Sequence, residues 1–292
     1  MESFVQALVA ALPVAGMYAL VAVSLVTIFR AVHIFNLAQG SYSIIAAFIF
    51  LEIYKAIGGD FWLSLLAAIA CAALMGVIAF RVIYRPLLGR VPIQLLMVSI
   101  GLDIALSSLA LTIWGPNIVF IKLPHLFDGV YRWGWISISK VNVVIVVVAV
   151  VLISAFGVVL KYTKFGLSMR ATSDLPVLST VRGIRVGRVS TAAWAIALAF
   201  GVIAAVAMGS SQGMTPNSAR ALGIAAVPAA VIGGIDSIAG ALCGSLVLAE
   251  VQMLATQYVG GAEANVVGWL LLLIFLVVRP TGLFGRREVA RL

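Results

Sequence analysis

One polar cluster interrupts a chain that is otherwise mostly apolar. The stretch HIFNLAQGSY, residues 33–42, places Asn36, Gln39, Ser41 and Tyr42 within seven positions between two long apolar runs. Their amide and hydroxyl groups could hydrogen-bond a polar solute on its route, or they could hold neighbouring helices together. In the second case Asn36 would cap the helix that follows. The spacing leaves both interpretations open and slightly favours packing.

Three carboxylates lie inside apolar runs: Asp103, Asp236 and Glu250. An ionisable residue at the centre of a membrane helix costs about 2.5–3.5 kcal/mol on insertion scales, so each suggests a functional role. Two of them also have a simpler explanation. Asp236 could cap the helix beginning IAGALCG, and Asp103 could pair with a neighbouring helix, although the sequence names no partner.

Enzyme chemistry finds little support in the sequence. The only histidines are His33 and His125, far apart along the chain, and no His/Glu metal motif is present. Both cysteines, Cys71 and Cys243, lie in apolar runs where they fit as packing residues. No phosphate-binding Gly-x-x-x-x-Gly-Lys-Ser/Thr loop occurs, so this chain is not expected to hydrolyse ATP. We expect a protein that is not an enzyme and carries no metal or cofactor of its own.

The elements that position these residues must be membrane helices. The chain is 63% hydrophobic and 10% charged, with a mean hydropathy of +1.19. Apolar runs near 20 residues are long enough to cross a bilayer, and lipid restricts such spans to helices here. We predict an all-α, polytopic bundle of about eight transmembrane helices, forming one domain over 1–292. The expected runs are 5–28, 37–57, 62–83, 93–113, 141–160, 191–211, 222–256 and 264–278.

Charge predicts the orientation. Fourteen of the 19 Lys and Arg residues fall on one set of connections and on the C-terminal tail. The positive-inside rule therefore places the N-terminus outside and the C-terminus in the cytoplasm. The net charge of +9 then reflects topology and anionic lipid, without a nucleic-acid partner.

Successive spans cross the membrane in alternating directions. The run 222–256 must therefore begin and end outside, so that the last span can bring the C-terminus into the cytoplasm. A single 35-residue helix cannot do this, so we predict two short crossings or a re-entrant pair that turns near 233–240. Pro228 and the pair Gly233–Gly234 are the expected break points. Broken helices at membrane depth line cavities or lie buried in protein, which points to a translocation path.

Two connections carry further signals. The cytoplasmic segment 161–190 is basic and amphipathic, with Asp174 as an expected cap, Pro176 in the first turn and Gly183 as the stop. Its apolar stripe would lie on lipid or dock into a partner's groove, and it comprises Leu175, Val177, Leu178 and Val181. By composition alone, the lipid surface is slightly favoured. The extracytoplasmic segment 114–140 is rich in aromatic residues, which suit a membrane interface, with partner docking as a second hypothesis.

Several motifs together resemble one family. GMYALVAVSLVTIFRAVHIFNLAQGSY (16–42), KFGLSMRATSDLPVLSTVRGI (164–184), VIGGIDSIAGALCGSLVLAEVQ (231–252) and RPTGLFGRRE (279–288) resemble the signatures of branched-chain amino acid ABC permeases. The order matches over nearly the whole chain. The length is similar to the shorter, LivH-like type of permease.

The resemblance implies partners and a location. Such a permease pairs with a second permease, homologous or identical, and with two cytoplasmic subunits that bind ATP and Mg. A solute-binding protein delivers substrate from outside, in a bacterial or archaeal plasma (inner) membrane. The segment 174–183 would then be a coupling helix docked on an ATPase, preceded by Arg170, which replaces the lipid-surface interpretation. The polar stretch and the three acids would line the route: Asn36, Gln39, Ser41, Tyr42, Asp103, Asp236 and Glu250.

The match departs from the family where specificity is expected. Gln39 stands where the family usually has His, Ser41 where an acid is common, and Asp236 where a small or neutral residue is frequent. Family cargoes include aliphatic and other amino acids, urea and short amides, and aromatic acids. A stand-alone secondary transporter or channel is the alternative function, because broken helices also mark those folds.

Overall fold

The computed structural model describes residues 2–134, 136–174 and 176–285. The long helices are α1 (Glu2–Val32), α2 (Gln39–Ala56), α3 (Phe61–Ile78), α4 (Pro92–Trp114), α5 (Lys140–Tyr162), α8 (Val186–Ser211), α9 (Pro216–Gly233), α10 (Ile238–Tyr258) and α11 (Gly261–Val278). The shorter elements are η1 (Ala79–Tyr84), η2 (Arg85–Leu87), η3 (His125–Phe127), β1 (Val130–Trp133), β2 (Ile136–Ser139), α6 (Lys164–Asp174) and α7 (Pro176–Val181).

Six helices of the described chain are long and apolar enough to cross a membrane. They are Glu2–Val32, Phe61–Leu87, Pro92–Trp114, Lys140–Tyr162, Val186–Ser211 and Ile238–Tyr258. In Glu2–Val32 and Val186–Ser211, 72% and 67% of the apolar window is buried. In the spans that contain α3, α4 and α5, the buried share is only 22–33%. Helices α1 and α8 therefore form the centre of the bundle, and α3, α4 and α5 expose apolar faces of the kind that contact lipid or a partner helix. The all-α membrane class is confirmed.

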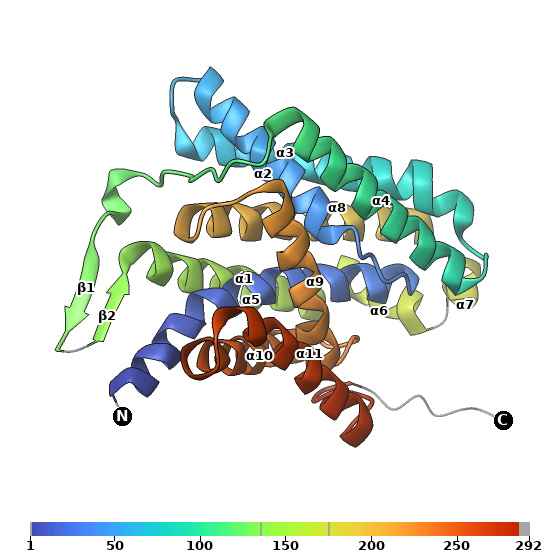
Figure 1. Cartoon of the computed structure of the whole chain (residues 1–292). Coiled ribbons are helices and arrows are strands. Elements are labelled where there is room, and N and C mark those ends of the chain that lie inside the picture. The colour runs from blue at the N-terminus through green and yellow to red at the C-terminus, as the bar shows by residue number, and fades with distance from the viewer. Residues whose placement is uncertain (1, 135, 175, 286–292) are drawn as a thin grey trace.

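The two ends of the bundle differ in structure (Figure 1). The N-terminus and the β1–β2 hairpin lie at one end, and α6 and α7 lie at the other. The hairpin is antiparallel, with Val130 opposite Ser139, and was not expected in an all-α chain. The Gln6 side chain donates from Nε2 to the Ser137 carbonyl oxygen at 2.9 Å, which ties the hairpin to the start of α1.

The connection from α5 to the basic end is a tight corner. The Thr163 hydroxyl accepts from the Gly166 amide at 3.3 Å, so the residue after α5 satisfies a free amide at the start of α6. A Cβ at Gly166 would lie 2.0 Å from the Leu160 carbonyl oxygen, so the corner requires glycine. Two helices, α6 and α7, thus occupy a segment for which the sequence predicted one.

The region 222–256 is broken, as predicted, into α9 and α10, but Pro228 lies inside α9 and is not a break point. The break is at Gly234, which has a φ of +107°, and the Ser237 hydroxyl caps α10 by accepting from the Gly240 amide at 3.0 Å. The turn is held by the chain that follows α11: the Leu283 and Phe284 amides donate to the Ile232 and Gly233 carbonyl oxygens at 2.8 and 3.0 Å. In Figure 1, α9 runs across the direction of α1 and α8 instead of alongside them.

Candidate functional site

The polar stretch 33–42 is not continuous helix. Residues 33–38 are a non-helical connection, and α2 begins at Gln39 with Ala38 at its N-cap and no side-chain cap. The prediction that Asn36 caps this helix is therefore wrong. Asn36 instead bonds across the bundle, because its Nδ2 donates to Gln39 Oε1 at 3.4 Å and its Oδ1 accepts from the Tyr84 hydroxyl at 3.2 Å. Gln39 Nε2 donates to the Ala197 carbonyl oxygen of α8 at 3.1 Å.

Asp103 is the centre of a second group of polar contacts. Its Oδ1 accepts from the Ser41 hydroxyl at 2.5 Å, and its Oδ2 accepts from Arg220 Nε at 2.8 Å. The Asp103 side chain is 7% exposed and that of Arg220 is 45% exposed. The ion pair therefore joins α4 to α9 and, through Ser41, to the start of α2. Arg220 is the partner that the sequence could not name, because 117 positions separate the two residues.

The structure brings together only part of the predicted site. Asn36, Gln39, Ser41 and Asp103 are buried and bonded around the start of α2. Tyr42 is also buried, and its hydroxyl has no hydrogen-bond partner among the described residues.

The other two acids lie elsewhere. Asp236 is exposed in the turn between α9 and α10, and the cap of α10 is its neighbour Ser237. Glu250 is half-buried along α10. The start and end of α9 are roughly 25 Å apart at the helical rise per residue, so Asp236 does not belong to the Arg220 cluster. A path role for all seven residues stays a prediction.

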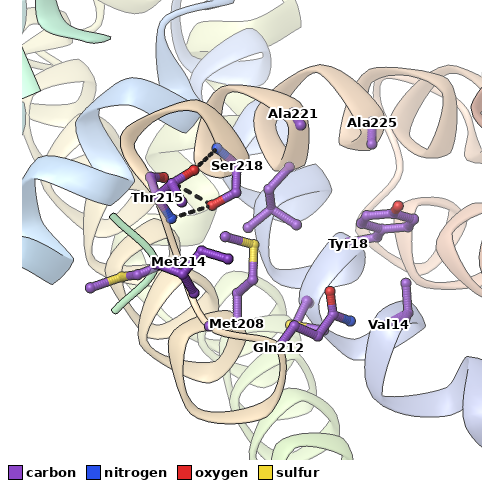
Figure 2. A pocket seen from close by; sticks show the side chains of 13 residues that line it. Val14, Tyr18, Met208, Gln212, Met214, Thr215, Ser218, Ala221 and Ala225 are labelled. Atoms are coloured by element: carbon purple, nitrogen blue, oxygen red, sulfur yellow. Dashed lines mark hydrogen bonds between the residues drawn. The ribbon is translucent and has the colours of Figure 1, made fainter. Parts of the chain in front are cut away.

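A cavity of about 430 Å³ lies beside the start of α9 (Figure 2). The residues lining it are uncharged and come from α1, Ile118, the end of α8, the connection 212–215 and α9. Its apolar wall includes Val14, Met17, Met208, Met214 and Leu222. Its size falls in the range of about 300–1,000 Å³ typical of small-molecule sites, which combine an apolar lining with a few polar groups.

The polar side chains of this cavity lie at the start of α9, on α1 and at Gln212, which follows α8. Thr215 and Ser218 form a capping box, in which the Thr215 hydroxyl accepts from the Ser218 amide at 3.0 Å and the Ser218 hydroxyl accepts from the Thr215 amide at 2.8 Å. Tyr18 lies across the cavity from them (Figure 2) and donates to Gln252 Oε1 at 2.9 Å. The sequence analysis missed these residues, although Thr-Pro at 215–216 is a typical helix start.

This arrangement fits a small solute with one polar and one apolar end. The N-terminus of a helix carries partial positive charge and favours an anionic group. The methionine side chains adapt their shape and suit an apolar group of variable outline. The cavity can therefore accommodate a zwitterionic or neutral solute with an aliphatic part.

The segment predicted to couple to a partner lies at the basic end of the bundle. Helix α7 spans Pro176–Val181, and Gly183 follows it with a φ of +81°, which confirms the predicted stop. Asp174 is the last residue of α6, so the single helix predicted over 174–183 is corrected to the end of α6 followed by α7.

The exposed face of α7 is apolar. Leu178 is 46% exposed and Val181 is 78% exposed, while Ser179 faces the bundle and is 4% exposed. Arg170 Nη2 donates to the Lys161 carbonyl oxygen at 3.4 Å. Leu175 and the side chains of Asp174, Pro176 and Val177 lie outside the described residues.

Several apolar helices, a polar cluster buried between them and a solute-sized cavity define a multi-pass membrane permease. The family model described as "Branched-chain amino acid transport system / permease component" matches residues 7–278. The chain belongs to this family, and the resemblance noted in the sequence is confirmed.

Curated relatives match over nearly their full length. The high-affinity branched-chain amino acid transport system permease protein LivH of Escherichia coli K12 is 30% identical, with 99% of this chain and 97% of the relative covered. The corresponding BraD protein of Pseudomonas aeruginosa is 29% identical, with 99% and 98% covered. A probable LivH permease of Methanocaldococcus jannaschii is 25% identical, with 91% and 88% covered.

One solved structure is similar in fold. A chain of PsaBC from Streptococcus pneumoniae, in complex with Fab, aligns with a TM-score of 0.50 and 13% identity. The alignment covers 93% of this chain and 91% of that chain. At this identity the likeness concerns the fold alone.

Proposed function

We propose that this chain is the permease subunit of an ATP-driven importer for branched-chain or related amino acids. The family membership supports the permease class, and the names of the relatives support the cargo class. ATP and Mg would be bound by two partner subunits, and a second permease, homologous or identical, would complete the membrane part. A solute-binding protein would deliver the amino acid at the end that carries the β1–β2 hairpin, across a bacterial or archaeal inner membrane.

The cavity beside α9 is the observation that carries the cargo assignment. Its lining is uncharged, so a substrate side chain with a full charge would lose hydration without a partner. A zwitterionic amino acid could place its carboxylate toward the start of α9, near Thr215 and Ser218. Its aliphatic side chain would then contact Met17, Met208 and Leu222.

The exposed apolar face of α7 supports coupling through this helix. Leu178 and Val181 lie on a helix next to basic connections, where bare apolar surface is expected to be covered. We propose that a groove of a partner ATPase covers this surface. Movements of the ATPase subunits would then be transmitted to the bundle through α6 and α7. If this surface contacted lipid instead, α7 would offer no contact through which ATP hydrolysis in a partner could drive transport.

Co-purification tests the proposal. The chain is purified from its native membrane in mild detergent, and an ATP-hydrolysing subunit is expected to come with it. Leu178→Arg/Val181→Arg should lose this subunit, because two charges would enter an apolar contact. The matched control is Leu126→Arg/Val130→Arg, which places the same charges on exposed residues in η3 and at the start of the hairpin, at the opposite end.

The opposite result has a clear form. If the native chain purifies alone and moves solute into liposomes without ATP, it is a stand-alone secondary transporter or channel. If the ATPase stays bound to the α7 variant, the coupling surface is elsewhere.

A further inference from the structure

A second cavity lies at the basic end of the bundle, apart from the proposed substrate cavity. It measures about 380 Å³ and lies between the end of the α3 span and the start of α8. The residues that line it are Arg81, Arg85, Arg185, Gly187, Arg188 and Thr191. Four guanidinium groups thus share one hollow, and no carboxylate is among its lining residues.

Among the described residues, these arginines have no acidic partner. Within the part of the chain that the structure describes, none of the four guanidinium groups forms a hydrogen bond or an ion pair. All four side chains are exposed. Like charges held together repel, so the arrangement favours an anion that offers several oxygen acceptors.

The two walls of the cavity are held in a fixed relation by packing. The Tyr84 ring lies 4.4 Å from the Trp194 ring, centroid to centroid, and both side chains are fully buried. A Cβ at Gly76 would lie 2.6 Å from the Trp194 carbonyl oxygen, so α3 and α8 approach with backbone in contact. The arginines are therefore mounted on rigid elements, and a π-helical segment, Ala79–Tyr84, carries Arg81.

Exposed apolar residues lie along the same span as Arg81 and Arg85, in α3 and in the segment Ala79–Tyr84 that follows it. Leu74, Ile78 and Val82 are 58%, 50% and 67% exposed. The spacing of four residues places Leu74 and Ile78 on one face of α3, and Arg81, Val82 and Arg85 follow them in the same apolar span. This span therefore presents exposed hydrocarbon and then guanidinium groups toward its end, in the order in which a phospholipid presents acyl chain and phosphate.

We propose that this cavity binds a phosphate group, carried by the headgroup of an anionic phospholipid whose acyl chain lies along Leu74, Ile78 and Val82. Basic pockets between transmembrane helices are suited to such headgroups. Arginine is suited to the phosphate because its planar guanidinium donates two parallel hydrogen bonds. A free phosphate would use the four arginines but would leave the apolar strip without a role.

Native mass spectrometry of the detergent-purified chain tests this binding. Phosphatidylglycerol is added, with phosphatidylcholine as the neutral comparison. Arg85→Gln/Arg188→Gln should weaken phosphatidylglycerol binding by roughly thirtyfold, the scale expected for removing two charges that face an anionic headgroup. Arg182→Gln/Arg279→Gln is the matched control: it removes two exposed charges from the same end, outside the cavity, and should leave occupancy unchanged.

Further arms separate the alternatives. Arg85→Lys/Arg188→Lys should keep most of the binding and shows that the Gln variant acts through charge and not through misfolding. Equal loss in both Gln variants, or none in either, overturns the proposal. If the chain retains inorganic phosphate but does not prefer phosphatidylglycerol over phosphatidylcholine, the bound phosphate is not carried by a lipid. If Arg85→Gln/Arg188→Gln binds as much phosphatidylglycerol as the native chain but loses a partner ATPase, the arginines form a protein contact instead.

Discussion

At the scale of single residues, the buried polar groups hold the helices together. Ser41, Asp103 and Arg220 come from three helices, and their contacts at 2.5 and 2.8 Å fix α2, α4 and α9 to one another. A buried carboxylate is tolerated only when it is paired and hydrogen-bonded. The pair therefore positions the start of α9, which is also a wall of the proposed substrate cavity.

Breaking this pair from the arginine side is expected to be the more damaging change. Arg220→Met leaves the Asp103 carboxylate buried with Ser41 alone, and should cost about 3 kcal/mol, the low end for broken buried pairs because Arg220 is partly exposed. Asp103→Asn keeps acceptor and donor groups and should cost less. Thermal unfolding in detergent measures both, with Arg132→Met on the exposed hairpin as the control. The double variant should lose less than the sum, and strict additivity would show that the pair does not couple the helices.

At the scale of elements, glycine sets how closely α9 crosses α2. A Cβ at Gly223 would lie 2.6 Å from Gly40 Cα and 2.7 Å from its amide nitrogen, so the two backbones are in contact. Small residues at such crossings are the usual means of close helix packing in membranes. The crossing places Gly40, between Gln39 and Ser41, directly against α9.

Gly223→Ala should force this crossing apart. We expect a loss of about 1–3 kcal/mol, as for other over-packed sites, together with reduced amino acid uptake in cells. Gly101→Ala is the matched control, since Gly101 is exposed on α4 and a Cβ there meets nothing within 4 Å. The melting temperature in detergent and the initial uptake rate are the two readouts. Equal behaviour of the two variants would show that α9 can shift without consequence.

At the scale of the whole molecule, the two ends of the bundle differ both in their basic residues and in the short elements that they carry. The basic residues near 81–90, 161–170 and 182–188 gather at the end that carries α6 and α7, while the hairpin and the N-terminus lie at the other (Figure 1). The positive-inside rule then predicts that α7 lies on the cytoplasmic side, where the proposed ATPase would bind.

Cysteine labelling in intact cells checks this orientation. With Cys71 and Cys243 replaced by Ala, Ser137→Cys on the hairpin should react with a membrane-impermeant maleimide. Val181→Cys, which is 78% exposed on α7, should react only after the cells are permeabilised. Labelling of Val181→Cys alone in intact cells would reverse the topology and remove α7 from the ATPase side.

The membrane class, most helix positions and the break near 233–240 could be predicted because they depend on local sequence. Long apolar runs require helices in lipid, and Gly234 permits a positive φ that ends α9. The stop at Gly183 follows from the same conformational freedom. The prediction that Asn36 caps α2 was wrong because it used the residue type alone. The Asn36 side chain bonds to Gln39 and to the distant Tyr84 instead.

The sequence by itself determined that this chain is a multi-pass helical permease, since hydropathy, charge and motif order act along the chain. The tertiary structure decided which residues meet. The Asp103–Arg220 pair, the approach of Gly223 to Gly40 and the four-arginine cavity all join positions far apart in sequence. Such contacts depend on how helices cross, and the crossing is set by the packing of many side chains together, which no local pattern records.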